Sequence, residues 1–400
     1  MTTASTPTAA TDAHGHWVDR AREVAAVLAR DALERDRANA EPFAEAGLLR
    51  EAGLPALLIP AEHGGAGQTW RTALAVVREV SRADGSIGQL IGYHYVNLVN
   101  LWWTGSADAR AELLARSARE QWLWGDAVNP IDPDLALAPH GDGYRLSGRK
   151  AFSTGASVGD AIVATGAVST TGEPLLVAVL RGQAGIELGG DWDNLGQRLS
   201  ASGSVAFHDV DVPADRVLAS LAPEAVTPRA SLITPAIQAV FGHLYLGVAE
   251  GALAAARDYT RERARPWVLG TAPAATQEPH VLEGYGGLVA RVAAVAALAD
   301  RVAAGLAEAD ARGAALTWRE RGDLAVDVAQ LKVVSTEVSL DVTSRIFEFT
   351  GARSTASSYG LDRFWRNVRT HTLHDPVAYK RREVGERYLN GRLPEFTLYT

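Results

Sequence analysis

The densest group of chemically useful side chains lies near the C-terminus, in the run FWRNVRTHTLHDPVAYK at residues 364–380. Among its aromatic residues stand three cations and two histidines: Arg366, Arg369, Lys380, His371 and His374. Such a mixture is typical of a site for an anionic or redox ligand. The alternative is a solvated basic helix face, which is what most charge runs are, but the interleaved aromatic residues argue against a run that faces only solvent.

His371 and His374 stand three residues apart, a spacing that would place both on one side of a helix. Because imidazole titrates near neutrality, such a pair could position or protonate a bound ligand. A metal site is the alternative interpretation, but no carboxylate-rich motif accompanies the two histidines, so we expect no metal.

Composition and charge limit the possible partners. The chain has 400 residues, of which 47% are hydrophobic and 22% charged, and its formal net charge is −8. The cations are spread along the chain, which argues against a nucleic-acid or anionic membrane surface and favours small-molecule partners. The absence of cysteine excludes disulfides and zinc-thiolate sites and fits a reducing compartment. With no ordinary signal peptide and no long apolar run, we expect a cytoplasmic protein that does not span a membrane.

The elements that must position these residues fall into three segments, which predict an α+β fold. Residues 1–120 show helical periodicity interrupted by a glycine-rich loop. Residues 121–225 contain short β-rich runs such as YRLSG, AIVATGAV and LLVAVL between Gly, Asp and Pro turns. Residues 226–400 return to long Ala-, Leu- and Val-rich helical segments that are typical of a bundle. We expect the ligand site where the three units meet.

Several motifs resemble the acyl-CoA dehydrogenase superfamily in order and at family spacing, over nearly the whole chain. They are GLPALLIPAEHGGAG, AVVREVSRADGSIG, GYRLSGRKAFSTGASVGDAIVATG and LGQRLSASGSVAFHDVDVPADRVL. The resemblance implies an N-terminal helical domain, a middle β-barrel-like domain and a C-terminal four-helix bundle. It also implies a homotetramer with flavin at the subunit junctions.

A narrower resemblance is carried by YLGVAEGALAAARDYTRERARPW and by the C-terminal run, which look like the flavin-dependent (group D) monooxygenases related to dibenzothiophene monooxygenase. It implies an enzyme that takes reduced FMN or FAD from a separate NAD(P)H:flavin reductase. Such an enzyme adds O2 at flavin C4a and transfers one oxygen atom from the C4a-(hydro)peroxyflavin to a hydrophobic substrate. Thiophene-type sulfur, indole-type carbon and amine nitrogen are the atoms that the resemblance suggests.

Dehydrogenation is the alternative activity, because Asp375 falls where an acyl-CoA dehydrogenase has its catalytic glutamate. This carboxylate is one methylene shorter and is followed by proline, and a base must lie within about 2.6–3.2 Å of the proton that it removes. The Arg-Asn pair at 366–367 also replaces the family's Arg-Asp pair. We therefore favour oxygenation, and a catalytically idle flavin-binding scaffold is a third possibility.

Two arginines are candidates for the flavin phosphate. Arg353 stands where dehydrogenases have the last glycine of a GGxG segment that admits the adenosine half of FAD. A guanidinium suits a terminal phosphate, so FMN is favoured over FAD. The resemblance matches Arg263 to an arginine that contacts flavin phosphate across the subunit interface. Without the resemblance, both would be read as helix-surface arginines in ion pairs.

The resemblance also assigns residues around the flavin ring. Phe152 corresponds to an aromatic residue that packs on the flavin, and Thr154 to a hydroxyl that bonds near N5 and O4. Ser202 corresponds to a phosphate-contacting hydroxyl, and Trp192 precedes its loop and could form a wall of the pocket. Asn129 is the polar anchor of the remaining flavin loop, since an amide can both donate and accept. Taken alone, these residues would be read as parts of strands, turns and core.

The substrate side is expected in the segment IGYHYVNLVNLWW, where Tyr93, His94 and Tyr95 suit a flat apolar substrate. Aromatic residues at helical spacing also commonly fill cores, which is an equal alternative for the two tryptophans that end the segment. We assign His374 as acid or peroxide stabiliser and His371 as flavin or substrate contact.

Overall fold

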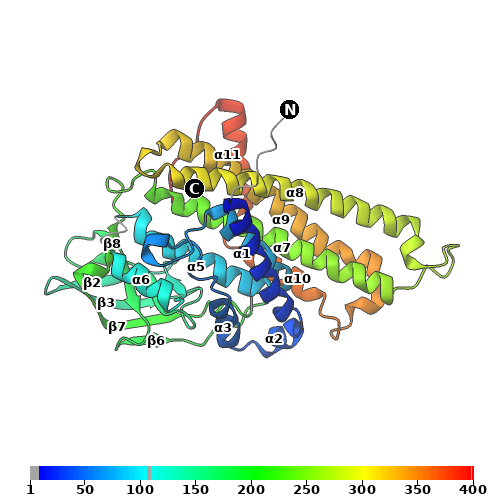
Figure 1. Cartoon of the computed structure of the whole chain (residues 1–400), viewed down its shortest axis with the longest axis horizontal. Coiled ribbons are helices and arrows are strands. Elements are labelled where there is room, and N and C mark those ends of the chain that lie inside the picture. The colour runs from blue at the N-terminus through cyan, green and yellow to red at the C-terminus, as the bar shows by residue number, and fades with distance from the viewer. Residues whose placement is uncertain (1–8, 106–109, 398) are drawn as a thin grey trace.

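The computed structural model describes residues 9–105, 110–397 and 399–400. N-terminal helices, a mixed sheet and a C-terminal helical bundle follow one another along the chain, which confirms the predicted α+β arrangement (Figure 1). The N-terminal helices are α1 (Ala9–Leu28), α2 (Ala32–Ala38), α3 (Phe43–Glu51), α4 (Trp70–Ala83), α5 (Gly85–Trp103) and α6 (Ala111–Arg119).

Helix α5 is buried along its whole length and connects the three parts of the molecule. It begins at Asp84, whose Oδ1 accepts hydrogen bonds from the backbone N–H groups of Ser86 at 3.0 Å and Ile87 at 3.4 Å. Because α5 packs against α4, against the bundle and against the first strand of the sheet, its side chains can reach both neighbouring units.

The middle part is a mixed sheet of eight strands. They are β1 (Trp124–Ala127), β2 (Leu135–His140), β3 (Gly143–Lys150), β4 (Ala161–Val168), β5 (Pro174–Leu180), β6 (Ile186–Leu188), β7 (Val205–Val212) and β8 (Val217–Ser220). The order is β6-β7-β3-β2-β4-β5-β8, and β1 also pairs with β4. Strand β4 is parallel to β1 and β2 and antiparallel to β5. A core of its own, including Leu146, Ile162 and Phe207, holds this sheet together.

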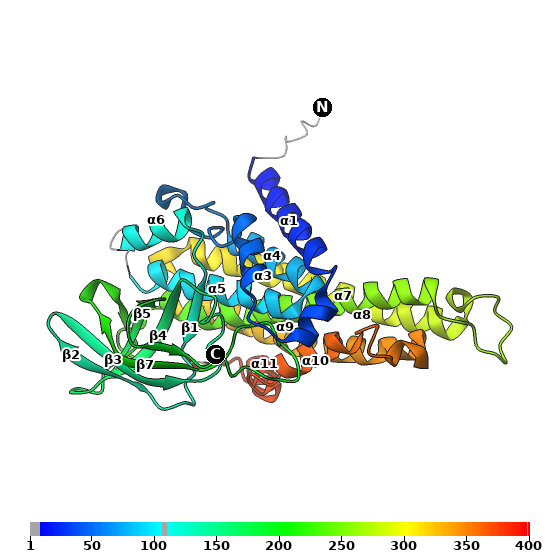
Figure 2. The ribbon, with the colours of Figure 1, turned by 90° about the horizontal axis from the view of Figure 1, so that it is seen from below.

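The C-terminal bundle consists of α7 (Ile233–Glu262), α8 (Pro279–Ala311), α9 (Trp318–Thr350), α10 (Asp362–His371) and α11 (Val377–Asn390). Helix α7 lies at its centre and contacts α4, α5, α8, α9 and α10. Gly251 allows α4 and α7 to approach closely, because a Cβ there would lie 2.0 Å from the carbonyl oxygen of Arg82. Helices α7, α8 and α9 extend well beyond the sheet as a long arm (Figure 2).

Helices α7 and α8 are long and apolar enough to cross a membrane by length and composition alone. In α7, 89% of the most hydrophobic window is buried inside the protein, so its apolar character is explained by the core. In α8 only 22% of the corresponding window is buried. The outer face of α8 therefore leaves apolar side chains exposed on the arm.

Candidate active site

A chain of buried hydroxyl groups connects the sheet to α5. Oγ1 of Thr154, in the loop after β3, lies 2.9 Å from Oγ of Ser202 and accepts a hydrogen bond of 3.1 Å from Nε2 of Gln89 on α5. Oγ of Ser202 lies in turn 2.7 Å from Oγ of Ser200. The sequence-predicted pair Thr154 and Ser202 is thus brought together, with Gln89 as a third member that the sequence did not identify.

Polar atoms without protein partners lie around these hydrogen-bonded hydroxyl groups. Among the described residues, Oε1 of Gln89, Oγ of Ser153 and both amide atoms of Gln197 are buried and have no hydrogen-bond partner. Unpaired buried polar atoms cost about 1–3 kcal/mol each, and such a cluster is unusual unless a ligand or water satisfies it. The site therefore has the donor and acceptor set that a polar ring edge requires.

An aromatic pair, the exposed Phe152 and the half-buried Trp192, lies beside the buried hydroxyl groups. The Phe152 side chain is 61% exposed. Its backbone adopts a left-handed φ of 55°, which is a strained conformation for this residue. Its ring meets that of Trp192 edge-to-face, with centroids 5.7 Å apart. Nε1 of Trp192 donates to the carbonyl oxygen of Gln197 at 2.7 Å, which fixes the indole. Two aromatic faces next to unpaired amides form a surface suited to a flat heterocycle.

Strand β1 contains one buried acid, Asp126, and the loop after it contains one polar anchor, Asn129. Oδ1 of Asn129 accepts from the backbone N–H of Ile131 at 3.2 Å, and its carbonyl oxygen accepts from Nζ of buried Lys150 at 2.8 Å. Oδ2 of Asp126 accepts a 3.3 Å hydrogen bond from the side chain of Asn97. Burial raises the pKa of Asp126 to about 7, against the hydrogen bonds that lower it.

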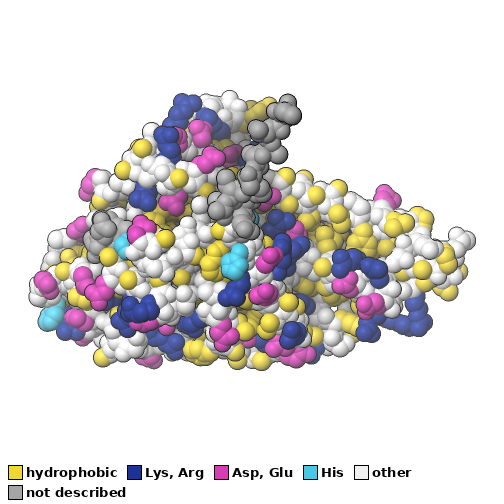
Figure 3. Space-filling view, viewed as in Figure 1, with side chains coloured by type: hydrophobic (Ala, Val, Ile, Leu, Met, Phe, Trp, Pro, Cys, Tyr) yellow, Lys and Arg dark blue, Asp and Glu magenta, His cyan; other side chains and the backbone are white. Residues whose placement is uncertain are grey.

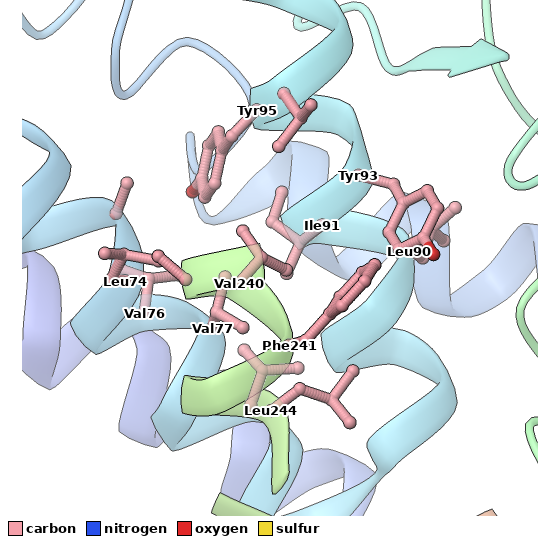
Figure 4. Close-up of a cluster of buried hydrophobic side chains, with 14 of the residues drawn as sticks. Leu74, Val76, Val77, Leu90, Ile91, Tyr93, Tyr95, Val240, Phe241 and Leu244 are labelled. Atoms are coloured by element: carbon pink, nitrogen blue, oxygen red, sulfur yellow. The ribbon is translucent and has the colours of Figure 1, made fainter. Parts of the chain in front are cut away.

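The first histidine of the C-terminal run lies in an aromatic cluster. His371 is buried, with its Nε2 at 3.3 Å from the hydroxyl of Tyr93 and its Nδ1 at 2.9 Å from the hydroxyl of Tyr245. The ring of Phe241 packs against both Tyr93 and His371, with centroids 5.9 Å and 4.6 Å away, and Figure 4 shows the Tyr93 side chain directed toward Phe241. Burial holds the pKa of His371 well below its ordinary value, so the imidazole is neutral.

His374 follows α10 instead of belonging to it, so the expected pairing on one helix face is wrong in detail. The loop nevertheless returns its ring to a position parallel to that of His371, with centroids 6.0 Å apart. The side chain is 37% exposed, and its Nδ1 lies 3.3 Å from Oδ1 of Asp375. The two imidazoles thus differ: one is enclosed, and one is accessible and paired with a carboxylate.

Two of the three residues predicted to face the substrate point elsewhere. Nε2 of His94 lies 2.8 Å from the carbonyl oxygen of Pro55, and its Nδ1 accepts from the backbone N–H of Trp124 at 3.0 Å. The hydroxyl of Tyr95 donates to the carbonyl oxygen of Leu54 at 3.0 Å. Tyr93 and Tyr95 leave α5 in different directions (Figure 4). Only Tyr93 joins the His371 cluster, and substrate contact by the other two stays a prediction.

The predicted phosphate arginines lie together but far from Thr154. Arg263 caps the C-terminal end of α7, and Arg353 lies in the short turn after α9, so both belong to the end of the arm that points away from the sheet. Both side chains are exposed. The guanidinium of Arg263 lies 5.7 Å from the ring centroid of Tyr359. Within one protein molecule, therefore, Arg263 and Arg353 do not reach the buried hydroxyl groups of Thr154, Ser200 and Ser202.

A direct contact joins the sheet side of the site to the C-terminal run. Oδ1 of buried Asn367 on α10 accepts a 2.8 Å hydrogen bond from the backbone N–H of Gln197. The orphan amide of Gln197 and the start of the histidine run are thus fixed relative to each other. Hydroxyls, aromatic faces and imidazoles therefore meet at the junction of sheet, α5 and bundle.

Comparison with known proteins shows the family to which this chain belongs. Residues 11–121 match the family described as Acyl-CoA dehydrogenase, N-terminal domain, and residues 239–378 match Acyl-CoA dehydrogenase, C-terminal domain. This chain belongs to the acyl-CoA dehydrogenase family. Its place is in the monooxygenase branch, since similar proteins over nearly the whole length are flavin-dependent monooxygenases. The predicted family and its branch are thereby confirmed.

Three relatives illustrate the similarity. The probable FMNH2-dependent monooxygenase SfnC of Pseudomonas putida is 41% identical, covering 95% of this chain and 96% of that protein. A dibenzothiophene monooxygenase of Mycolicibacterium goodii is 40% identical over 98% of both chains. The structure of TdsC from Paenibacillus sp. A11-2 in complex with FMN and indole has a TM-score of 0.92 at 38% identity, covering 96% of this chain and 99% of that one.

Several site residues were not found from the sequence, although some left a signal. Gln89 precedes Tyr93 by one helical turn on α5, so the periodicity of that helix could have paired them. Lys332 is a single cation inside the apolar segment VAQLKVVS, an arrangement that often marks a buried charge. Gln238, Phe241 and Tyr245 lie on the buried α7 and look like core residues in the sequence.

Proposed function

We propose that the protein uses reduced FMN, with reduced FAD as the second choice, and O2 to insert one oxygen atom into a hydrophobic heteroaromatic or heteroatom substrate. A separate NAD(P)H:flavin reductase supplies the reduced flavin. The reaction balances as substrate, O2 and FMNH2 giving oxygenated substrate, FMN and water. When bound, the reduced flavin supplies the two electrons and carries the oxygen. The observation that supports the proposal is the meeting of the buried hydroxyl groups, the Phe152–Trp192 pair and the two imidazoles at one junction.

The residues present fit a flavin ring. Phe152 and Trp192 offer aromatic faces to the tricyclic system, and Thr154 and Gln89 offer groups that can bind its polar edge. The unpaired Oε1 of Gln89 and the amide of Gln197 would gain partners from such a ring. Gln89, Thr154 and Trp192 are each already held by a hydrogen bond within the protein, and preorganised groups of this kind bind with less cost of ordering side chains.

The imidazoles and tyrosines define the substrate side. Tyr93, Phe241 and His371 form an apolar wall whose polar atoms are paired internally. His374 remains accessible and can hold or return a proton. A wall of this composition suits a planar substrate with a thiophene-type sulfur, an indole-type carbon or an amine nitrogen. The relatives support this range, because one acts on dibenzothiophene and another is seen with indole.

The contacts of Asp375 argue against acyl-CoA dehydrogenation. Its Oδ1 lies 2.6 Å from Nζ of buried Lys332. Although burial alone would raise the pKa of Asp375, His374 and Lys332 hold it well below its usual range. A base that removes an α-proton needs a pKa near the operating pH, so this carboxylate is a poor replacement for the dehydrogenase glutamate.

Self-association completes the proposed site. The outer face of α8 exposes apolar side chains, among them Leu282, Val289, Ala290 and Ala293, and hydrophobic atoms are spread over the arm (Figure 3). Exposed apolar patches of this kind mark protein contacts. We propose a homotetramer in which the arm brings Arg263 and Arg353 to the flavin phosphate of a neighbouring copy. A cytoplasmic location, where a flavin reductase is available, is part of the same proposal.

The test is a substrate screen with reduced FMN regenerated in place by a flavin reductase and NADH. Dibenzothiophene, indole and an aryl amine are incubated with the protein, and products are analysed by mass for the gain of one oxygen atom from 18O2. The proposal expects incorporation of one labelled atom that depends on the protein. Bleaching of bound FAD by an acyl-CoA, without oxygen incorporation, would instead support dehydrogenation. Binding of flavin with neither reaction would leave the idle scaffold.

A further inference from the structure

A buried ion pair between Lys332 and Asp375 lies next to His374. Nζ of Lys332 on α9 donates to Oδ1 of Asp375 at 2.6 Å and to Oε1 of Gln238 at 3.1 Å. Nε2 of Gln238 approaches Oδ2 of the same carboxylate at 3.4 Å. Lys332 is 0% exposed and Asp375 is 5% exposed. The ammonium also lies 4.4 Å from the ring centroid of Phe241, so the pair is held from three sides.

Stability does not explain such a pair. The desolvation of two buried charges commonly exceeds or equals their attraction, and well-packed apolar residues of similar volume serve a fold at least as well. The location of this pair is informative, because the oxygen of Asp375 that binds Lys332 also faces Nδ1 of His374 at 3.3 Å. Lys332, Asp375 and His374 are thus connected by consecutive polar contacts that lead from the core to the accessible imidazole ring.

The charge of the carboxylate decides the tautomer of the imidazole. Lys332 and His374 outweigh the effect of burial and hold the pKa of Asp375 well below its usual range, so this side chain is ionised and can only accept hydrogen bonds. The proton of a neutral His374 therefore lies on Nδ1. Nε2, which has no hydrogen-bond partner among the described residues, is left as the nitrogen that can gain a proton.

We propose that Lys332 and Asp375 are positioning residues that hold His374 in the Nδ1–H tautomer and present Nε2 to the reactants. The proton that Nε2 gains from a bound reactant is returned from the same nitrogen, and Asp375 stays ionised throughout. The arrangement has the logic of an aspartate that orients a histidine, with the lysine setting the charge of the aspartate. A role in oxygenation rests on the proposed function, whereas the state of His374 does not.

The two partners act on His374 with opposite sign. Loss of the ammonium leaves the neighbouring carboxylate uncompensated, which favours the protonated imidazole. Loss of the carboxylate leaves the ammonium of Lys332 without its partner, which disfavours the protonated imidazole. The other titratable groups that face this cluster are His371 at the end of α10, the buried tyrosines Tyr93 and Tyr245, Tyr399, and the Lys380–Glu383 pair on α11.

Carbethoxylation of the flavin-free protein by diethyl pyrocarbonate measures this effect. A histidine reacts with this reagent only through an unprotonated imidazole nitrogen, and peptide mass mapping gives the rate at His374 as a function of pH. We expect Lys332→Met to raise the pH of half-maximal rate by about one unit and Asp375→Asn to lower it. The double variant should lie between them. Lys380→Met is the control for removal of a more distant buried lysine, because Lys380 bonds to Glu383 and to the carbonyl oxygen of Tyr399 and not to His374 or Asp375, and its shift should be clearly smaller than that of Lys332→Met.

Equal shifts in both single variants, or none, would overturn the inference, as would a shift of the same size in Lys380→Met. If Lys332→Met does not fold, Lys332→Gln provides the same loss of charge with a polar side chain. In the oxygenation assay, both single variants should lower kcat about 100-fold with little change in KM. Opposite shifts of the midpoint in the two single variants, in a protein that oxygenates no substrate, would contradict the proposed function alone. Oxygenation without these opposite shifts would contradict this inference alone.

Discussion

The hydroxyl of Tyr93 lies 3.3 Å from Nε2 of His371, a contact that joins the middle of α5 to the end of α10. The hydroxyl of Tyr245 on α7 binds the other ring nitrogen at 2.9 Å and the carbonyl oxygen of His371 at 3.2 Å. One buried neutral imidazole therefore ties three helices together at the wall of the candidate site. Its polar atoms are all paired within the protein, whereas the ring of His374 remains accessible.

Removal of the Tyr245 hydroxyl tests this role. In Tyr245→Phe, Nδ1 of His371 loses its partner inside the core, and an unpaired buried polar group costs about 1–3 kcal/mol. We expect the free energy of unfolding, measured by urea titration, to fall by this amount. Tyr93→Phe, which removes the longer contact, should cost less. Tyr388→Phe, at a residue that is 88% exposed, should have no measurable effect. A loss as large in the Tyr388 variant would contradict the interpretation.

The site could be predicted from the sequence where local motifs carry it. KAFSTGA places Phe152 and Thr154 two residues apart, and the structure brings Thr154 to Ser202, a contact that the separate assignments of these two residues to ring edge and phosphate did not predict. The partners from helices could not be found in this way. A single glutamine or lysine in an apolar helix carries no motif, and only tertiary packing determines whether Gln89 or Lys332 reaches the site.

The predicted substrate segment shows the same limit. Consecutive residues of a helix point about 100° apart, so Tyr93, His94 and Tyr95 cannot all face one pocket. Aromatic composition drew attention to this helix but could not show which of its faces carries each side chain. Which face turns inward depends on the elements that pack around α5, and here the backbone of residues 54–55 and of Trp124 binds His94 and Tyr95.

Thr154→Val tests the hydroxyl chain as part of the flavin site. Valine preserves the shape but removes the hydrogen bonds to Gln89 and Ser202. We expect the Kd for FMN, measured by fluorescence quenching, to rise about tenfold, which corresponds to one hydrogen bond of about 1.4 kcal/mol. The matched control is Thr343→Val, because Thr343 is equally buried but bonds only to the carbonyl oxygens of residues 339 and 340. Weaker binding in both variants would point to a general loss of packing.

Val289→Glu tests self-association through α8. Val289 is 52% exposed on the outer face of this helix, and a carboxylate buried in an interface without a partner is strongly unfavourable. We expect the variant to elute as a smaller species by size exclusion with light scattering, while its circular dichroism stays unchanged. Val27→Glu, at a comparably exposed valine of α1, should keep the assembly of the natural protein. Unchanged mass in the α8 variant would exclude this face as an interface.

The buried carboxyl of Asp126 predicts a pH dependence of stability with a definite sign. Burial raises its pKa in the folded protein to about 7, whereas the ordinary value is 3.8. Between these two values the folded state holds a proton that the unfolded state releases, so this group lowers the free energy of unfolding as pH rises. The slope is at most about 1.4 kcal/mol per pH unit, and it disappears above the folded pKa.

Asp126→Asn removes this slope, because the amide imitates the protonated acid and can still accept from Asn97. The absolute curves also contain an opposite contribution from His94 and His243, whose pKa values burial lowers to about 4, so that stability falls as pH drops below 6.5. The difference between variant and natural protein, measured by urea titration at each pH, isolates the carboxyl. Relative to the natural protein, the free energy of unfolding of the variant should increase by up to about 4 kcal/mol between pH 4 and pH 7. A difference that stays constant over this interval would show that Asp126 is ionised in the folded protein, and that a cation or a bound ligand compensates its charge.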